Sequence, residues 1–77
     1  QRMCNFLIDK APAQIGGETV SSINTLDGVK YHLADGSWLL IRPSGTEPVL
    51  RVYAEGRSPQ ILDAMMSFGE QIAAEAT

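Results

Sequence analysis

A seven-residue segment, residues 42–48, holds the side chains of this chain that are best suited to binding chemistry. Its sequence, Arg-Pro-Ser-Gly-Thr-Glu-Pro, combines one guanidinium, two hydroxyls and a glycine with two prolines. A phosphate group is held by a planar fork of N–H donors, by short hydroxyl donors and by backbone amides that converge without a Cβ between them. The segment supplies all three kinds of donor, so it is a candidate anion-binding loop.

Four residues of this loop are the candidate ligands. Arg42 can donate two parallel N–H bonds to two phosphate oxygens, while the hydroxyls of Ser44 and Thr46 can donate to the third. Gly45 lets its own N–H and that of Thr46 face the anion. In the simpler alternative, Gly45 serves only the turn.

Glu47 does not fit among the ligands, because its carboxylate would repel a phosphate dianion. We expect Glu47 to point away, and either to pair with Arg51 or to accept backbone N–H groups that hold the shape of the loop. In the simplest alternative to an anion site, Arg42 is a surface residue paired with Glu47 or Glu55. The two prolines restrict the residues before them to extended backbone, which partly shapes the loop in advance.

The loop joins two apolar segments that are rich in branched and aromatic residues, and both are predicted to be strands. Two Asp-Gly pairs, at residues 27–28 and 35–36, predict hairpin turns. Ser58 followed by proline predicts a helix start, and Gly69 in that helix predicts a close approach to a strand. The expected elements are a helix over 2–9, strands over 20–25, 29–33, 37–41 and 49–54, and a helix from 59 onward. The fold class expected from this pattern is α+β, with a four-stranded antiparallel sheet and helices packed on one face.

The composition of the chain excludes several classes of function. With 77 residues, 44% of them hydrophobic and 19% charged, the chain is expected to be one soluble globular domain. A net charge of −3 with only six scattered Lys and Arg residues argues against nucleic-acid binding. A single cysteine excludes an internal disulfide, and one histidine makes a metal site improbable. No signal peptide or apolar run indicates a membrane, so we expect a cytoplasmic protein.

The loop and the strand after it, residues 42–55, closely resemble the phosphate-binding loop and following strand of the α-D-phosphohexomutases. Residues 26–29 and 35–38 are similar to the C-terminal, fourth domain of that family. The resemblance implies a fold like that of the TATA-box-binding protein. It also implies that Arg42, Ser44, Gly45 and Thr46 hold the phosphate that is not transferred, while a phosphoglucomutase or phosphomannomutase interconverts hexose 1-phosphate and hexose 6-phosphate.

The family's phosphoserine loop, magnesium loop and sugar loop have no counterpart in this sequence. We therefore expect residues 1–77 to be one phosphate-binding domain of a larger mutase, inactive alone and without a metal or other cofactor of its own, with magnesium in the full-length enzyme. The first residue, Gln1, is likewise expected to lie within a longer polypeptide. The expected partners are a phosphorylated hexose and the other domains of that polypeptide. The alternatives are a stand-alone module that binds phosphorylated ligands and the C-terminal domain of a phosphoglucosamine mutase.

Overall fold

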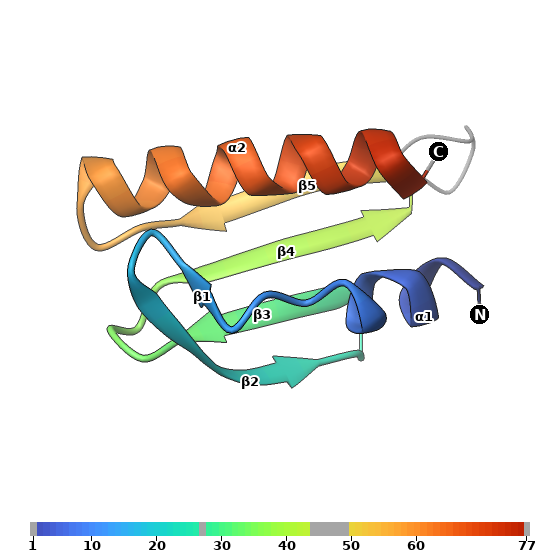
Figure 1. Cartoon of the computed structure of the whole chain (residues 1–77), viewed down its shortest axis with the longest axis horizontal. Helices are drawn as coiled ribbons and strands as arrows, with labels where there is room; N and C mark the ends of the chain where they lie inside the picture. Colours follow the sequence, from blue (N-terminus) through green and yellow to red (C-terminus); the bar gives the residue numbers. More distant parts are fainter. Residues whose placement is uncertain (1, 27, 44–49, 77) are drawn as a thin grey trace.

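The computed structural model describes residues 2–26, 28–43 and 50–76 of the chain (Figure 1). Two helices and five strands follow one another in these residues. The elements are α1 (Arg2–Asp9), β1 (Gln14–Ile15), β2 (Glu18–Asn24), β3 (Val29–Leu33), β4 (Trp38–Pro43), β5 (Leu50–Glu55) and α2 (Pro59–Ala76).

The five strands form one sheet in the order in which they occur along the chain, β1-β2-β3-β4-β5. Each strand pairs with the next in antiparallel orientation. The α+β class is confirmed, but the expected number of four strands is wrong. The additional strand, β1, has only two residues and therefore shows no alternating pattern that sequence periodicity could detect.

The short strand β1 is joined to β2 by a turn of two glycines. Ile15 is paired with Glu18, and the residues between them, Gly16 and Gly17, both have positive φ, at 61° and 87°. Two central residues with positive φ define the tight turn whose twist matches that of a two-stranded ribbon. The elements expected from the sequence left residues 10–19 outside any helix or strand, whereas the glycine pair there forms a hairpin turn.

Three other predicted features are confirmed. The helix over residues 2–9 and the strand over residues 29–33 have the predicted bounds. At the start of α2, the Ser58 hydroxyl accepts a hydrogen bond of 3.2 Å from the backbone N–H of Ile61, which is the predicted cap. The strands β4 and β5 lie within two residues of the predicted segments, so the secondary structure around the candidate loop was foreseeable.

Both helices pack on the same face of the sheet (Figure 1). The residues that alternate along the strands explain this arrangement, because successive side chains of a strand point to opposite faces. Along β3, the three apolar residues are buried and the two polar residues between them are half-buried. The core contains Leu7, Ile15, Val29, Tyr31, Leu33, Leu39, Ile41, Ile61, Met65 and Ile72.

Two contacts hold the helices against this face. The Tyr31 hydroxyl, fully buried in β3, donates a hydrogen bond of 2.8 Å to the backbone carbonyl of Leu7 in α1. In α2, Gly69 lies so close to β5 that a Cβ added there would be 2.7 Å from Cγ1 of Val52. The predicted reason for a glycine in the middle of this helix is therefore confirmed.

The opposite face of β3, β4 and β5, which we call the open face, carries the other half of each strand's residues. Strand pairing places Lys30 opposite Leu40 and His32 opposite Trp38. It also places Leu40 opposite Tyr53, Arg42 opposite Arg51 and Trp38 opposite Glu55. These residues are half-buried or exposed, whereas the core-face residues of β3 and β4 are buried.

Candidate functional site

Arg42, the first predicted ligand, lies near the end of β4 on the open face. Its neighbour Ile41 is fully buried on the core face, so the Arg42 side chain leaves the strand on the other side. The guanidinium carbon lies 6.0 Å from the centre of the Tyr53 ring, within the range of a cation–π contact. The side chain is thus half-buried and rests against an aromatic ring of the neighbouring strand.

Gly28 makes room for this part of β4. It has a φ of 94°, a conformation that side chains rarely adopt. A Cβ added at Gly28 would lie 2.6 Å from Cβ of Arg42 and 2.6 Å from the carbonyl oxygen of Ile41. Glycine is therefore required both by the turn and by the close approach of the backbone that carries Arg42.

Arg51 is the direct cross-strand partner of Arg42. Two residues that face each other in an antiparallel pair have Cβ atoms about 5 Å apart and lie on the same face of the sheet. Arg51 is exposed. The Arg51 side chain therefore leaves the sheet next to that of Arg42.

The other three predicted ligands, Ser44, Gly45 and Thr46, lie outside the described residues, as does Glu47. Their grouping around an anion with Arg42 stays a prediction. The described structure does establish that β4 ends and β5 begins on either side of this segment, as the sequence predicted.

A hollow of about 300 Å³ lies on the open face, over β3 and β4. Its floor includes Leu40, two residues before Arg42 along β4, and Lys30, which lies opposite Leu40 on β3. The ammonium group of Lys30 lies 4.4 Å from the centre of the Trp38 ring, a distance at which the ring attracts a cation. The remaining lining residues are Asn24, Leu26 and His32.

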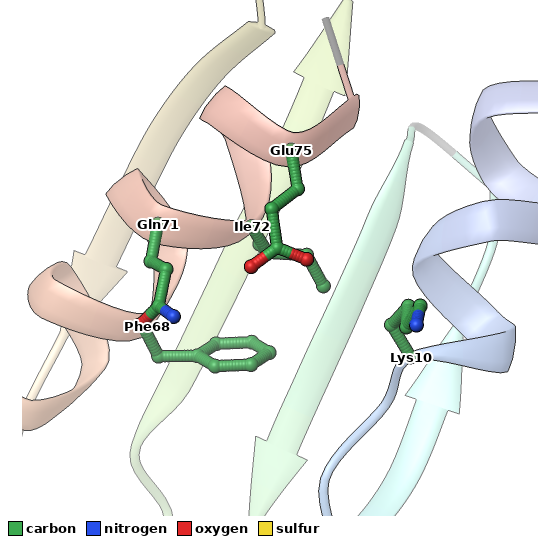
Figure 2. Close-up of a pocket in the computed structure, with 5 residues that line it drawn as sticks. All are labelled: Lys10, Phe68, Gln71, Ile72 and Glu75. Carbon is green, nitrogen blue, oxygen red and sulfur yellow. The ribbon is translucent and has the colours of Figure 1, made fainter.

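A second hollow, of about 180 Å³, lies on the helical side of the molecule (Figure 2). Figure 2 shows the side chains of Phe68, Gln71 and Glu75 extending from α2, with Lys10 opposite them at the end of α1. Its charged residues are one lysine and one glutamate, so their charges oppose each other. An anion would be attracted less strongly there than on the open face, where Arg42, Arg51 and Lys30 lie on neighbouring strands.

Within residues 2–26, 28–43 and 50–76, no group of three or more His, Cys, Asp or Glu side chains could hold a metal ion. In the same residues, no helix is long and apolar enough to cross a membrane.

The family model of the phosphoglucomutase/phosphomannomutase C-terminal domain matches residues 5–68. The chain belongs to this family. The match covers the five strands and the candidate loop, residues 42–48, of this mutase C-terminal domain, so the family resemblance inferred from the loop is confirmed.

Relatives of the mutase domain carry several mutase names. A probable phosphoglucosamine mutase of Methanothermobacter thermautotrophicus is 41% identical over 58 residues, which cover 73% of this chain and 13% of that protein. A phosphopentomutase of Thermococcus kodakarensis is 46% identical over 46 residues, covering 60% of this chain and 10% of that protein. A phosphoglucomutase/phosphomannomutase of the same organism is 34% identical over 64 residues, covering 83% and 14%. The domain therefore spans only about an eighth of the length of the relatives it matches.

Three residues around Arg42 were absent from the predicted set of ligands for this mutase domain: Gly28, Arg51 and Tyr53. The alternation along residues 50–55 already indicated that Arg51 and Tyr53 share a face. Their position beside Arg42 depends on the register between β4 and β5. That register cannot be read from the length of the loop that joins the two strands. For Gly28, the turn was predicted but its contact with Arg42 was not.

Proposed function

We propose that this chain is the phosphate-clamping C-terminal domain of a phosphohexomutase that interconverts hexose 1-phosphate and hexose 6-phosphate. The proposed ligands of the phosphate that is not transferred are Arg42, Ser44, Gly45 and Thr46. The observation that carries the proposal is the position of Arg42, at the end of β4 on the face that neither helix covers, directly before the segment that holds the other three.

In this function, the domain contributes binding energy rather than reacting groups. The planar fork of Arg42 would fix a phosphate by two parallel hydrogen bonds. The cation–π contact with Tyr53 already restrains the guanidinium, so less conformational entropy is lost when the ligand binds. Binding energy from a phosphate remote from the reacting oxygen can orient the sugar for transfer. Because the clamp contacts the phosphate alone, it can accept the hexose in either of two orientations.

We propose that the phosphorylated serine, the sugar-binding residues and magnesium belong to other domains of a cytoplasmic enzyme, and that the isolated chain has no mutase activity. Among the described residues, no group of side chains fits a metal ion. A fold like that of the TATA-box-binding protein would be consistent with an antiparallel sheet that carries its helices on one face.

The proposal can be tested by titrating glucose 1-phosphate into the ¹⁵N-labelled chain. The amide signals of Gly45 and Thr46 should shift together, with a millimolar Kd, equivalent to about −4 kcal/mol, because other domains supply the sugar contacts. Arg42→Lys should weaken binding strongly although it keeps the charge, since lysine lacks the planar fork. Unsubstituted glucose is the control and should cause no shifts. Signals that shift elsewhere, or equally with glucose, would refute the proposal.

A phosphoglucosamine mutase is a second candidate for the parent enzyme. Four relatives that are 41% to 49% identical to the chain carry the name probable phosphoglucosamine mutase. The isolated domain should bind glucose 6-phosphate and glucosamine 6-phosphate equally, because only the phosphate is in contact. The kcat/KM of the full-length enzyme for the two sugars therefore decides between the candidates.

A further inference from the structure

Strand β5 lies at one edge of the sheet, and in the part of the chain that the structure describes it pairs with β4 alone (Figure 1). Val52 and Ala54 of β5 pack against the core but are only half-buried. On the neighbouring strand, Leu39 and Ile41 are fully buried. Solvent therefore reaches β5 from its free side. Such an edge presents a row of N–H and C=O groups that can pair with a further strand.

The flank of α2 next to this edge is apolar. Gly69 approaches Val52 of β5, so this side of the helix faces the edge strand. A helix turns by about 100° per residue, which places Leu62 and Met66 on the same flank as Gly69. The α2 side chains that Figure 2 shows extending toward α1 belong to the opposite flank. Leu62 is 37% exposed and Met66 is half-buried, so an apolar strip runs beside the open edge.

The exposed residues of β5 make the strand complementary to itself. Arg51, Tyr53 and Glu55 are exposed and lie on the open face. When two copies of a strand pair in antiparallel orientation, residues that oppose each other lie on the same face of the sheet. If Tyr53 opposes Tyr53 of a second copy, Arg51 of each copy opposes Glu55 of the other. Every other register that keeps the two open faces together separates these charges.

We propose that two copies of this chain associate through β5, whose antiparallel pairing joins the two sheets across a two-fold axis. Each Arg51 forms an ion pair with Glu55 of the other copy, and the strips formed by Leu62 and Met66 face each other on the helical side. Opposite charges and aromatic residues in such cross-strand positions stabilise a strand pair. The inference does not depend on the proposed function, because no ligand takes part in the contact. One strand pair and one helix flank make a small interface, so the association should be weak.

The experiment measures the Kd of the dimer of the 77-residue chain by sedimentation equilibrium. With rising concentration, the mass should increase from that of one chain toward that of two. Arg51→Glu and Glu55→Arg each place like charges opposite each other twice, so each should raise the Kd at least tenfold. The double variant with both changes restores opposite charges and should recover the Kd of the wild-type chain. Arg57→Glu is the matched control, because it changes the net charge as Arg51→Glu does but lies beyond β5; its Kd should change less than twofold.

A mixing experiment tests the register itself. The Arg51→Glu chain has two glutamates at the paired positions, and the Glu55→Arg chain has two arginines there. Unlike charges therefore oppose each other only in the mixed dimer. At a concentration where each variant alone is monomeric, an equimolar mixture should form dimers. In the wild-type chain, backbone amides of β5 should exchange with solvent more slowly as the concentration rises, while those of β2 keep their rates.

Three results would overturn the inference. The first is a chain that stays monomeric at every concentration, which would leave this edge to a strand of the longer polypeptide. The second is association that both single variants leave unchanged, because the contact would then lie elsewhere. The third is a pair of variants that are folded by circular dichroism and monomeric, yet fail to associate when mixed, because the strands would then not pair in this register. The proposed function stands in all three cases.

Discussion

Replacing Gly69 with alanine should improve the helix propensity of α2 but worsen its packing against β5. Gly69 lies in the interior of α2, where alanine is more favourable than glycine by about 1 kcal/mol. The added Cβ would lie 2.7 Å from Cγ1 of Val52 and 3.3 Å from Cδ1 of Leu39. The first distance is too short for two carbon atoms, so α2, β5 or the valine must move.

The packing cost should exceed the gain in propensity. Overpacking of a filled core costs about 1–3 kcal/mol. Val52 is β-branched, so it cannot easily rotate its Cγ1 away, and Leu39 is fully buried and hemmed in by the core. The expected net loss is about 1 kcal/mol in the free energy of unfolding, which would lower the thermal midpoint of a chain this small by about 4–8 °C.

The prediction is tested by urea unfolding of the variants in a double-mutant cycle. In the Val52→Ala background, Cγ1 is absent, so Gly69→Ala should stabilise the chain by up to about 1 kcal/mol. The interaction energy between the two positions should then be about 2 kcal/mol. Ser67→Ala, at an exposed position of the same helix, reports helix propensity without the contact. A Gly69→Ala variant that is about 1 kcal/mol more stable than the wild-type chain would show that α2 and β5 are not in tight contact.

Three further predictions concern single contacts. Burial raises the pKa of Tyr31 to about 12 from 10.0, so the contribution of the neutral hydroxyl to stability should be fully present below pH 10 and be lost, by about 2–3 kcal/mol, as the pH rises through 12; Tyr31→Phe should lack this loss, and equal alkaline slopes in urea titrations of both proteins would contradict the assignment. Gly28→Ala should destabilise the chain by more than 1 kcal/mol, because of its φ of 94° and its contact with Arg42, and should weaken phosphate binding; unchanged unfolding and Kd values would disprove the close approach. Ser58→Ala should cost about 1 kcal/mol in urea unfolding while Ser58→Asp restores it, and a neutral alanine variant would show that the cap is dispensable.

The central strands could be predicted because each is governed by local chemistry. In the segment 29–33, apolar and polar residues alternate strictly, and the buried positions follow that alternation. Ser58 with Pro59 marked the start of α2 for a similar reason, since both residues act within the first helical turn. Such features depend on neighbours in sequence, and sequence alone is sufficient to find them.

The features that were missed depend on contacts between distant segments. The strand β1 exists because Gln14 and Ile15 meet the start of β2 across two glycines, and two residues are too few to show a strand pattern. The position of Arg51 opposite Arg42 follows from strand register, which no local pattern specifies. In the same way, the contact of Gly28 with the end of β4 is visible only when the sheet is assembled.

In β3, β4 and β5, neighbouring residues point alternately toward the core and toward the open face, so they form two nearly independent sets. Inward positions such as Leu39 and Ile41 are locked by the helices, whereas outward positions such as Trp38 and Leu40 can change without opening the interior. A combinatorial library restricted to the outward positions should therefore retain folded members at high frequency. The surface next to Arg42 can in this way be reshaped for new ligands while the scaffold beneath it stays the same.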